Sequence, residues 1–148
     1  MADGERESFT ARLVADMRAH GGVPSEGYFR GRKLLILTTT GAKSGQPRTA
    51  VLAYRNDGDA WAIAASKGGA PENPGWFRNL EADPHATVEV NNEVVPVLAT
   101  LEATGPERDR LWNAHVAEMP GFGEYPAKTD RVIPMIRLER VAEPVATR

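Results

Sequence analysis

Short segments with strand character, joined by tight polar turns, make up most of this chain and constrain its fold more than any other feature. Asn56-Asp57-Gly58-Asp59 separates two of these segments and is typical of a hairpin turn, because Asn, Asp and Gly accept a positive φ. Asn91-Asn92 separates two more. Strands that follow one another through hairpins run antiparallel, whereas parallel strands need crossover connections, usually helices. The sequence therefore predicts an antiparallel sheet.

Six strands and three helices are expected, with the helices on the outside of an antiparallel β-barrel, so the fold class is mainly β with flanking helices (α+β). The expected strands are residues 33–39, 48–55, 60–66, 86–91, 93–101 and 132–138, and the expected helices are residues 5–20, 73–80 and 104–118. Thr104 and Glu107 have the spacing of a capping box at the start of the third helix. Pro96 indicates an edge or a bulge in its strand, because proline cannot donate to a ladder.

The length of 148 residues fits one domain, 1–148, and we expect residues 1–22 to form its N-terminal helix and residues 139–148 a flexible tail. Phe9, Leu13 and Met17 recur at helical spacing in that helix. We expect this stripe to pack on the domain, and the alternative is a peripheral contact with a membrane. No apolar run approaches the roughly 20 residues of a membrane span, and the polar start lacks the pattern of a secretory signal, so a cytoplasmic protein is expected.

Several kinds of site are excluded or disfavoured by residue type and spacing. The chain has no cysteine, which excludes disulfides, thiolate nucleophiles and Cys-ligated metals. His20, His85 and His115 are scattered, so no metal site is expected and each is interpreted as a surface residue. Gly41-Ala42-Lys43-Ser44 resembles the end of a phosphate-binding P-loop, but the first glycine is missing at the required spacing and a strand follows. We expect no nucleic-acid partner.

Charge is distributed unevenly along the chain. Residues 30–56 contain six cations and no carboxylate, although the net charge of the whole chain is −2. A purely basic stretch in an acidic protein is consistent with an anion-binding site, and the alternative is that basic side chains near strand edges discourage aggregation. Two glycine-containing polar turns, residues 40–48 and 64–69, favour the anion site, because backbone N–H groups, hydroxyls and cations together can hold phosphate or carboxylate oxygens.

Aromatic and apolar residues in two further places have two interpretations each. Trp76, Phe77 and Leu80 have the spacing of a core-facing helical stripe, and the alternative is that they belong to the site. The loop of residues 119–125 carries apolar groups that either cover a pocket or anchor the loop.

Three segments resemble the deazaflavin-dependent nitroreductase family, whose members are also called F420-dependent quinone reductases. They are residues 37–48 (LTTTGAKSGQPR), 64–69 (AASKGG) and 73–80 (NPGWFRNL), in the order of the family and at compatible spacing. The resemblance covers roughly residues 34–137. It implies a split β-barrel fold, and it implies reduced coenzyme F420, an 8-hydroxy-5-deazaflavin with a phosphodiester and an oligoglutamate tail, as hydride donor.

The resemblance also implies which residues contact the cofactor. Its phosphate and tail are expected beside Ala42, Lys43, Ser44 and Arg48. Its ring, ribityl chain and phosphate are expected beside Thr49, Ala50, Val51, Leu52, Ala53, Ala64, Ala65, Ser66, Lys67, Gly75, Trp76, Phe77, Arg78 and Asn79.

On the acceptor side, a characterised branch of the family has tyrosines where this chain has Ala53, Met119 and Phe122, and only Tyr125 matches. This difference implies a less polar pocket that favours quinones or planar enones. Met119, Phe122 and Tyr125 are the expected substrate-binding residues. Ser66 and Tyr125 are the candidate catalytic residues, each as a hydrogen-bond donor to the developing oxyanion of the acceptor.

The expected function is therefore hydride transfer from reduced coenzyme F420 to a small acceptor, which is quinone-like, nitroaromatic or an activated alkene. One alternative is an FMN-dependent reductase with the same fold. The other is a carrier that binds the deazaflavin without catalysis. The sequence indicates no oligomeric state.

Overall fold

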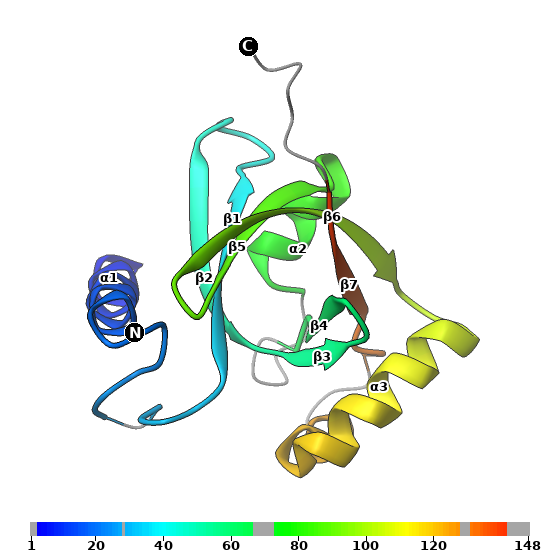
Figure 1. Ribbon diagram of the computed structural model, residues 1–148. Coiled ribbons are helices and arrows are strands. Elements are labelled where there is room, and N and C mark those ends of the chain that lie inside the picture. Colours follow the sequence, from blue (N-terminus) through cyan, green and yellow to red (C-terminus); the bar gives the residue numbers. More distant parts are fainter. Residues whose placement is uncertain (1–2, 28, 67–72, 128–130, 142–148) are drawn as a thin grey trace.

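The computed structural model describes residues 3–27, 29–66, 73–127 and 131–141, and their main feature is one curled antiparallel sheet with helices around it (Figure 1). The strands are β1 (Leu34–Thr40), β2 (Pro47–Ala53), β3 (Arg55–Asp57), β4 (Ala60–Ala64), β5 (His85–Val90), β6 (Glu93–Glu102) and β7 (Met135–Arg140). The helices are α1 (Asp3–Ala19), α2 (Gly75–Ala82), α3 (Pro106–Glu118) and the 3-10 helix η2 (Pro120–Ala127).

The sheet curls because its two end strands are consecutive in the chain. The strand order is β2-β1-β5-β6-β7-β4-β3, and every neighbouring pair is antiparallel. Only Tyr54 separates β2 from β3, so the chain passes from one end of the sheet directly to the other. The result is the predicted antiparallel barrel with helices on its outside, except that α2 lies within the curl as Figure 1 views it.

The main core fills the inside of the curl, and apolar residues of most strands supply it. Leu35 and Leu37 of β1 are fully buried there, together with Phe77 and Leu80 of α2. Leu34 and Ile36 point to the other face of β1, where they pack against α1. Because β1 is buried on both faces, its sequence is a continuous apolar run and not an alternating one.

Helix α1 covers the outer face of β1 and β2. Met17 is 1% exposed and Val14 is also buried, whereas Phe9 near the start of the helix is 39% exposed. The helix ends as its two glycines predict: Gly22 has a φ of 94° and donates its N–H to the carbonyl of Met17 at 2.7 Å. The stripe is therefore used mainly in packing on the domain.

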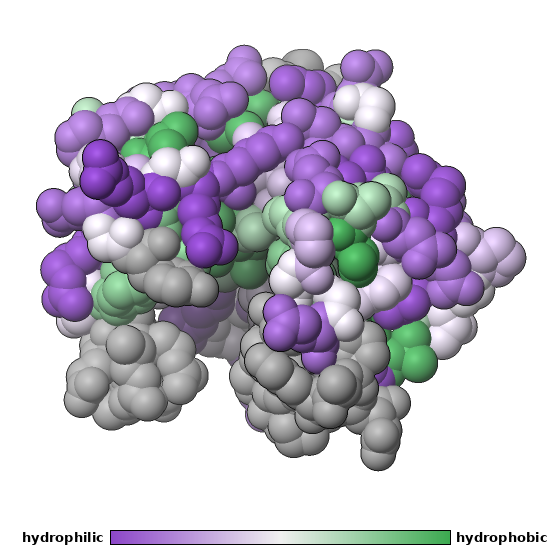
Figure 2. All heavy atoms as spheres, turned by 90° about the horizontal axis from the view of Figure 1, so that it is seen from below, coloured by the Kyte–Doolittle hydropathy of each residue, from purple (hydrophilic) through white to green (hydrophobic). Residues whose placement is uncertain are grey.

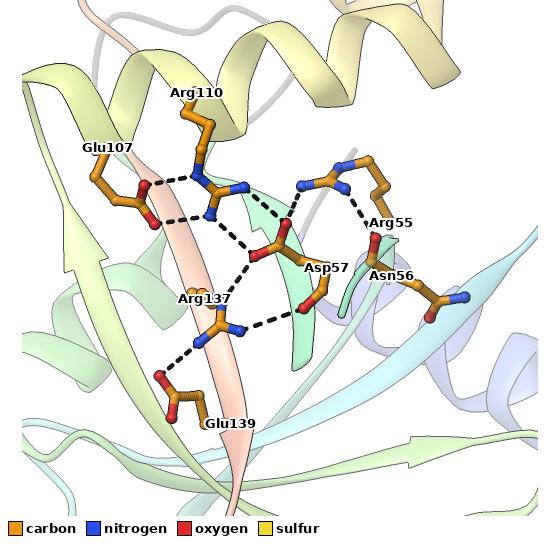
Figure 3. A network of polar contacts seen from close by, with 7 residues as sticks. All are labelled: Arg55, Asn56, Asp57, Glu107, Arg110, Arg137 and Glu139. Carbon is orange, nitrogen blue, oxygen red and sulfur yellow. Dashed lines mark hydrogen bonds and ion pairs between the residues drawn. The ribbon is translucent and has the colours of Figure 1, made fainter. Parts of the chain in front are cut away.

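A second layer lies on the opposite side of the barrel, where α3 and η2 pack against β4 and β7. A network of charges joins α3 to the sheet (Figure 3). Asp57, which is 7% exposed, accepts hydrogen bonds from Arg55 (2.8 Å), Arg110 of α3 (3.0 Å to each oxygen) and Arg137 of β7 (2.7 Å). These bonds, those from Arg110 first, hold the pKa of the Asp57 carboxyl well below its usual range.

Several expectations about local structure were wrong. The described residues form seven strands where six were expected, because Tyr54 interrupts the predicted strand 48–55. The capping box does not form: Gly105 is the N-cap of α3, and the Glu107 carboxylate instead accepts hydrogen bonds from Arg110. The predicted tail begins too early, because β7 extends to Arg140; residues 142–148 lie outside the described part.

Pro96 lies in β6, which is an interior strand with β5 and β7 on its two sides. The β7 ladder begins only at Val97, and the carbonyl of Pro96 accepts a bond from Val141, just beyond β7, at 3.1 Å. The N–H and C=O of one strand residue point to the same side, so the missing N–H of Pro96 faces the end of β7. The β6–β7 ladder therefore loses at most one hydrogen bond at its end, which explains why a proline is tolerated in an interior strand.

Candidate functional site

The turn between β1 and β2 is a compact, hydrogen-bonded loop. Gly41 donates its N–H to the carbonyl of Gln46 at 2.8 Å, and Gly45 donates to the carbonyl of Gly41 at 2.9 Å. The hydroxyl of Ser44 accepts from the Gln46 N–H at 3.1 Å and from the Arg48 guanidinium at 3.4 Å. A Cβ at Gly41 would come within 2.6 Å of the Ser44 hydroxyl oxygen and 3.2 Å of the Gln46 carbonyl oxygen, so a side chain at this position would displace the Ser44 hydroxyl from its contacts.

Asn79 of α2 fixes this turn from the side. Its side-chain oxygen accepts from the Ala42 N–H at 3.0 Å, and its side-chain nitrogen donates to the Thr39 hydroxyl at 3.0 Å. The amide therefore bridges the end of β1 and the turn that follows. Asn79 belongs to the predicted site residues, and in this arrangement both polar ends of its side chain position the loop.

We expect Asn79→Ala to weaken binding of an anionic ligand to the turn by about tenfold, because binding would then have to order the loop. Water can replace the exposed bond to Ala42, but the buried Thr39 hydroxyl would lose its bond to the amide, so the free energy of unfolding should fall by about 1–3 kcal/mol. Calorimetric titration and urea unfolding measure the two effects. Asn113→Ala, at an exposed position of α3, is the control and should change neither; equal ligand affinity in both variants would show that Asn79 does not position the turn.

A hollow of about 390 Å³ opens between this turn, the start of β2 and α2, and we call it the anion hollow. Three cations line it, Lys43, Arg48 and Arg78, and none of its lining residues is acidic. Such a set of charges favours ligands with phosphate or carboxylate groups. Its full lining is Gly41, Ala42, Lys43, Ser44, Arg48, Thr49, Ala50, Gly75, Trp76, Arg78 and Asn79.

A larger hollow of about 830 Å³ lies between α1, the bend at Tyr54 and η2, and we call it the apolar hollow. Helix α1 lies at the left of Figure 1, and the face seen from below carries apolar surface in a recess between polar margins (Figure 2). Most of the lining is apolar or aromatic: Phe9, Leu13, Phe29, Leu34, Val51, Ala53, Tyr54, Met119, Pro120, Gly121 and Phe122. The polar members are Thr10, Arg32, Lys33, Glu118 and Glu124.

Strand β2 connects the two hollows. Its first half, Arg48 to Ala50, lines the anion hollow, while Val51 and Ala53 line the apolar hollow. Seven residues of extended chain span roughly 20 Å. Among the described strands β2 pairs with β1 alone, so its other edge is available to a ligand. One elongated molecule with a charged end and a flat apolar end could therefore lie along this strand.

The second polar turn, predicted over residues 64–69, is described only as far as Ser66, and Arg131 contacts this part. The guanidinium of Arg131 donates to the carbonyls of Ala65 and Ser66, both at 2.9 Å, and to the Asn73 side chain at 2.6 Å. Ala64 and Ala65 are buried and Ser66 is half-buried. Lys67 lies outside the described residues. Arg131 was not predicted to be a site residue, because its partners lie 58 to 66 positions away in the sequence.

The remaining predicted residues fall in different surroundings. Phe77 is buried in the main core, and Leu52 packs against that core, so neither lines a hollow. Met119 and Phe122 line the apolar hollow, and Trp76 lines the anion hollow. Tyr125 lies in η2, but its side chain is outside what the structure describes.

His115 is fully buried, so its interpretation as a surface residue was wrong. Burial, and secondarily the charge of Arg55, lowers the pKa of His115 to about 4. Its ring meets the ring of Phe122 edge-on, with the centroids 4.5 Å apart. A neutral histidine of α3 thus supports the wall that η2 forms on the apolar hollow.

Comparison with known proteins gives concordant matches. The family model described as F420H(2)-dependent quinone reductase matches residues 10–140. A Mycobacterium tuberculosis protein named F420H(2)-dependent quinone reductase Rv1261c is 42% identical over 108 residues, which are 72% of this chain and 72% of that protein. A solved structure described as an F420-H2 dependent reductase (FDR-A) is 38% identical, with a TM-score of 0.66, over 73% of this chain and 95% of its own. Another solved structure, described as a domain-swapped dimer, is 32% identical, with a TM-score of 0.68. The match covers 93% of this chain and 100% of the chain in that structure.

Proposed function

The chain belongs to the F420H(2)-dependent quinone reductase family, and from this membership we propose that it transfers hydride from reduced coenzyme F420 to a quinone-type acceptor held in the apolar hollow. The protein is an oxidoreductase that uses coenzyme F420, and its fold is the split barrel of that family. The identity of the acceptor and the roles of individual residues in the reaction are what we propose. The observation that supports them best is the meeting of a cationic and an apolar hollow along one strand.

The anion hollow fits the charged part of coenzyme F420. A phosphodiester and an oligoglutamate tail carry several negative charges, and Lys43, Arg48 and Arg78 supply cations with no acidic residue among the lining. The glycine turn adds backbone N–H groups. When it is bound, the reduced deazaflavin supplies a hydride, and Thr49, Ala50, Val51 and Ala53 would hold its ring beside the apolar hollow.

The apolar hollow fits a planar acceptor with few polar groups. Its walls come from α1, β2 and η2, and they would shield part of the acceptor surface from water. Where a characterised branch of the family has tyrosines, Ala53, Met119 and Phe122 supply apolar contacts. This favours quinones over nitroaromatics, and activated alkenes are the second choice. Hydrogen bonding to the acceptor by Ser66 or Tyr125 stays a prediction.

The two alternatives receive less support. FMN has a single phosphate group, which would not pair with all three cations of the anion hollow. A carrier without catalysis would need the acceptor side to be closed, whereas the apolar hollow leaves a volume of about 830 Å³ there.

Peripheral membrane contact through α1 would be limited largely to Phe9 within the stripe, since Met17 and Val14 are buried. None of the described helices is both long and apolar enough to span a membrane.

We expect Thr10→Trp to raise the KM for menadione by about tenfold or more, because an indole at this position would occupy part of the apolar hollow. The dissociation constant of coenzyme F420 should stay within about twofold. Ser8→Trp is the matched control, since it adds the same side chain at an exposed position of the same helix and should leave KM unchanged. Equal KM values for the two variants, in steady-state oxidation of the reduced cofactor, would place the acceptor elsewhere.

A further inference from the structure

Lys33 places a positive charge in the apolar hollow. It is the residue directly before β1, and its Nζ lies 4.9 Å from the centre of the Tyr54 ring and 3.6 Å from a carboxylate oxygen of Glu118. All three residues line the hollow. Tyr54 is 4% exposed and forms part of the wall of the hollow, whereas the Lys33 side chain is 41% exposed.

The contacts of this ammonium leave it able to bind a further group. An ammonium has three N–H donors, and a carboxylate at 3.6 Å together with an aromatic face does not use all of them. The other charged groups of the hollow suit this role less well. Glu118 and Glu124 would repel an anion, and Arg32 is engaged in another interaction. Burial, and secondarily the charge of Glu118, raises the pKa of the Tyr54 phenol, so it remains neutral.

A cation of this kind suits the chemistry of a quinone acceptor. A quinone that has accepted a hydride is a hydroquinone monoanion, with the negative charge on an oxygen. In an apolar hollow this charge is poorly solvated unless the protein supplies a cation or donor beside it. One proton is also needed to complete the neutral hydroquinone.

We propose that Lys33 is a catalytic residue whose ammonium contacts an acceptor oxygen, stabilises the negative charge that develops there and donates the final proton. In that step one N–H bond of the ammonium breaks and one O–H bond forms on the hydroquinone. The neutral amine then regains a proton from water at its exposed side. The inference rests on the proposed function, because it requires an acceptor in the apolar hollow.

The direct test uses a stable mimic of the anionic product and needs no cofactor. Lawsone, 2-hydroxy-1,4-naphthoquinone, is an anion at neutral pH, and 1,4-naphthoquinone is its neutral counterpart. Calorimetric titration of both into the purified protein should show that Lys33→Met weakens lawsone binding by roughly 10- to 100-fold. Affinity for 1,4-naphthoquinone should stay within about threefold. Lys33→Arg, which keeps the charge, should retain most of the lawsone affinity.

Arg30→Met is the matched control, because it removes a cation from the same loop at an exposed position outside the hollow, and it should bind lawsone like the wild type. Circular dichroism checks that each variant is folded. If the wild type does not bind lawsone, or if Lys33→Met and Arg30→Met bind it equally, the role of Lys33 is overturned.

Turnover separates this inference from the proposed function. With reduced F420 and menadione, Lys33→Met should lower kcat by about tenfold or more with a small change in KM. Lys33→Arg should restore part of kcat. If the wild type shows no turnover with any quinone while lawsone binding still depends on Lys33, the proposed acceptor fails and the anion contact stands. If turnover is normal in Lys33→Met, Lys33 is not catalytic.

Discussion

Replacing both Lys43 and Arg48 by alanine is expected to weaken binding of coenzyme F420 by at least about a hundredfold. Each side chain is exposed on the rim of the anion hollow, and each is expected to make a charge-assisted contact of about 1.5–3 kcal/mol with the phosphate or the tail. Together they account for about 3–6 kcal/mol of binding free energy, if the two contacts are independent. Fluorescence titration of the purified variant with F420 measures the loss.

The same double variant should be as stable as the wild type, which separates a binding defect from a folding defect. Neither side chain is buried, and the contact of Arg48 with the Ser44 hydroxyl is long, at 3.4 Å. Its urea unfolding midpoint should therefore be unchanged. Arg12→Ala with Arg30→Ala is the control, because it removes two exposed cations outside the hollow. If both double variants lose the same affinity, the cations act only through the overall field and the anion hollow is not the site.

Asp57→Asn is expected to lower the free energy of unfolding by about 3–5 kcal/mol, the largest stability effect that the structure predicts for a single polar side chain. The Asp57 side chain is 9% exposed and neutralises Arg55, Arg110 and Arg137 at once. An amide at this position would remove the carboxylate from Arg55, whose side chain is only 12% exposed, while Arg110 and Arg137 would keep their ion pairs with Glu107 and Glu139. Urea unfolding monitored by circular dichroism measures the loss, and Asp59→Asn, at an exposed position of the same turn, should change it by less than about 0.5 kcal/mol.

The contribution of Asp57 to the free energy of unfolding should decrease as the pH falls. Its pKa in the folded protein lies below the unfolded value of about 3.9. The stabilisation is therefore complete above the unfolded pKa and is lost as the pH falls toward the folded one. The difference in unfolding free energy between wild type and Asp57→Asn should stay constant above about pH 5 and shrink below about pH 4. A difference that grows on acidification would contradict this assignment.

Hairpins and strand positions could be predicted from the sequence because local turn chemistry determines them. Asn91 and Asn92 adopt φ values of 51° and 67°, as a tight hairpin turn requires. The interruption at Tyr54 could not be predicted in this way. No turn residue marks it, and the bend arises because β2 pairs with β1 at one end of the sheet and β3 pairs with β4 at the other. The failure of the capping box at Thr104 has a local cause, since Arg110 competes for the Glu107 carboxylate.

The candidate site shows a similar division. The glycine turn with Lys43 and Arg48 could be expected from composition and from family resemblance, since it is contiguous in sequence. Residues that contact the site from distant parts of the sequence could not be predicted, because only the fold brings them next to their partners. Arg131 holds the carbonyl of Ser66 across 65 positions, and Lys33 reaches Glu118 only through the fold. His115 looked like a surface residue because its burial depends on η2 packing over it.

The most direct test of the central claim is a fluorescence titration of the purified protein with coenzyme F420, with FMN titrated in parallel. The arrangement of the anion hollow predicts saturable binding of F420 that excess FMN does not displace, and that weakens in the Lys43→Ala, Arg48→Ala variant. Tight, saturable binding of FMN without binding of F420 would contradict both the cofactor and the reaction proposed for this protein.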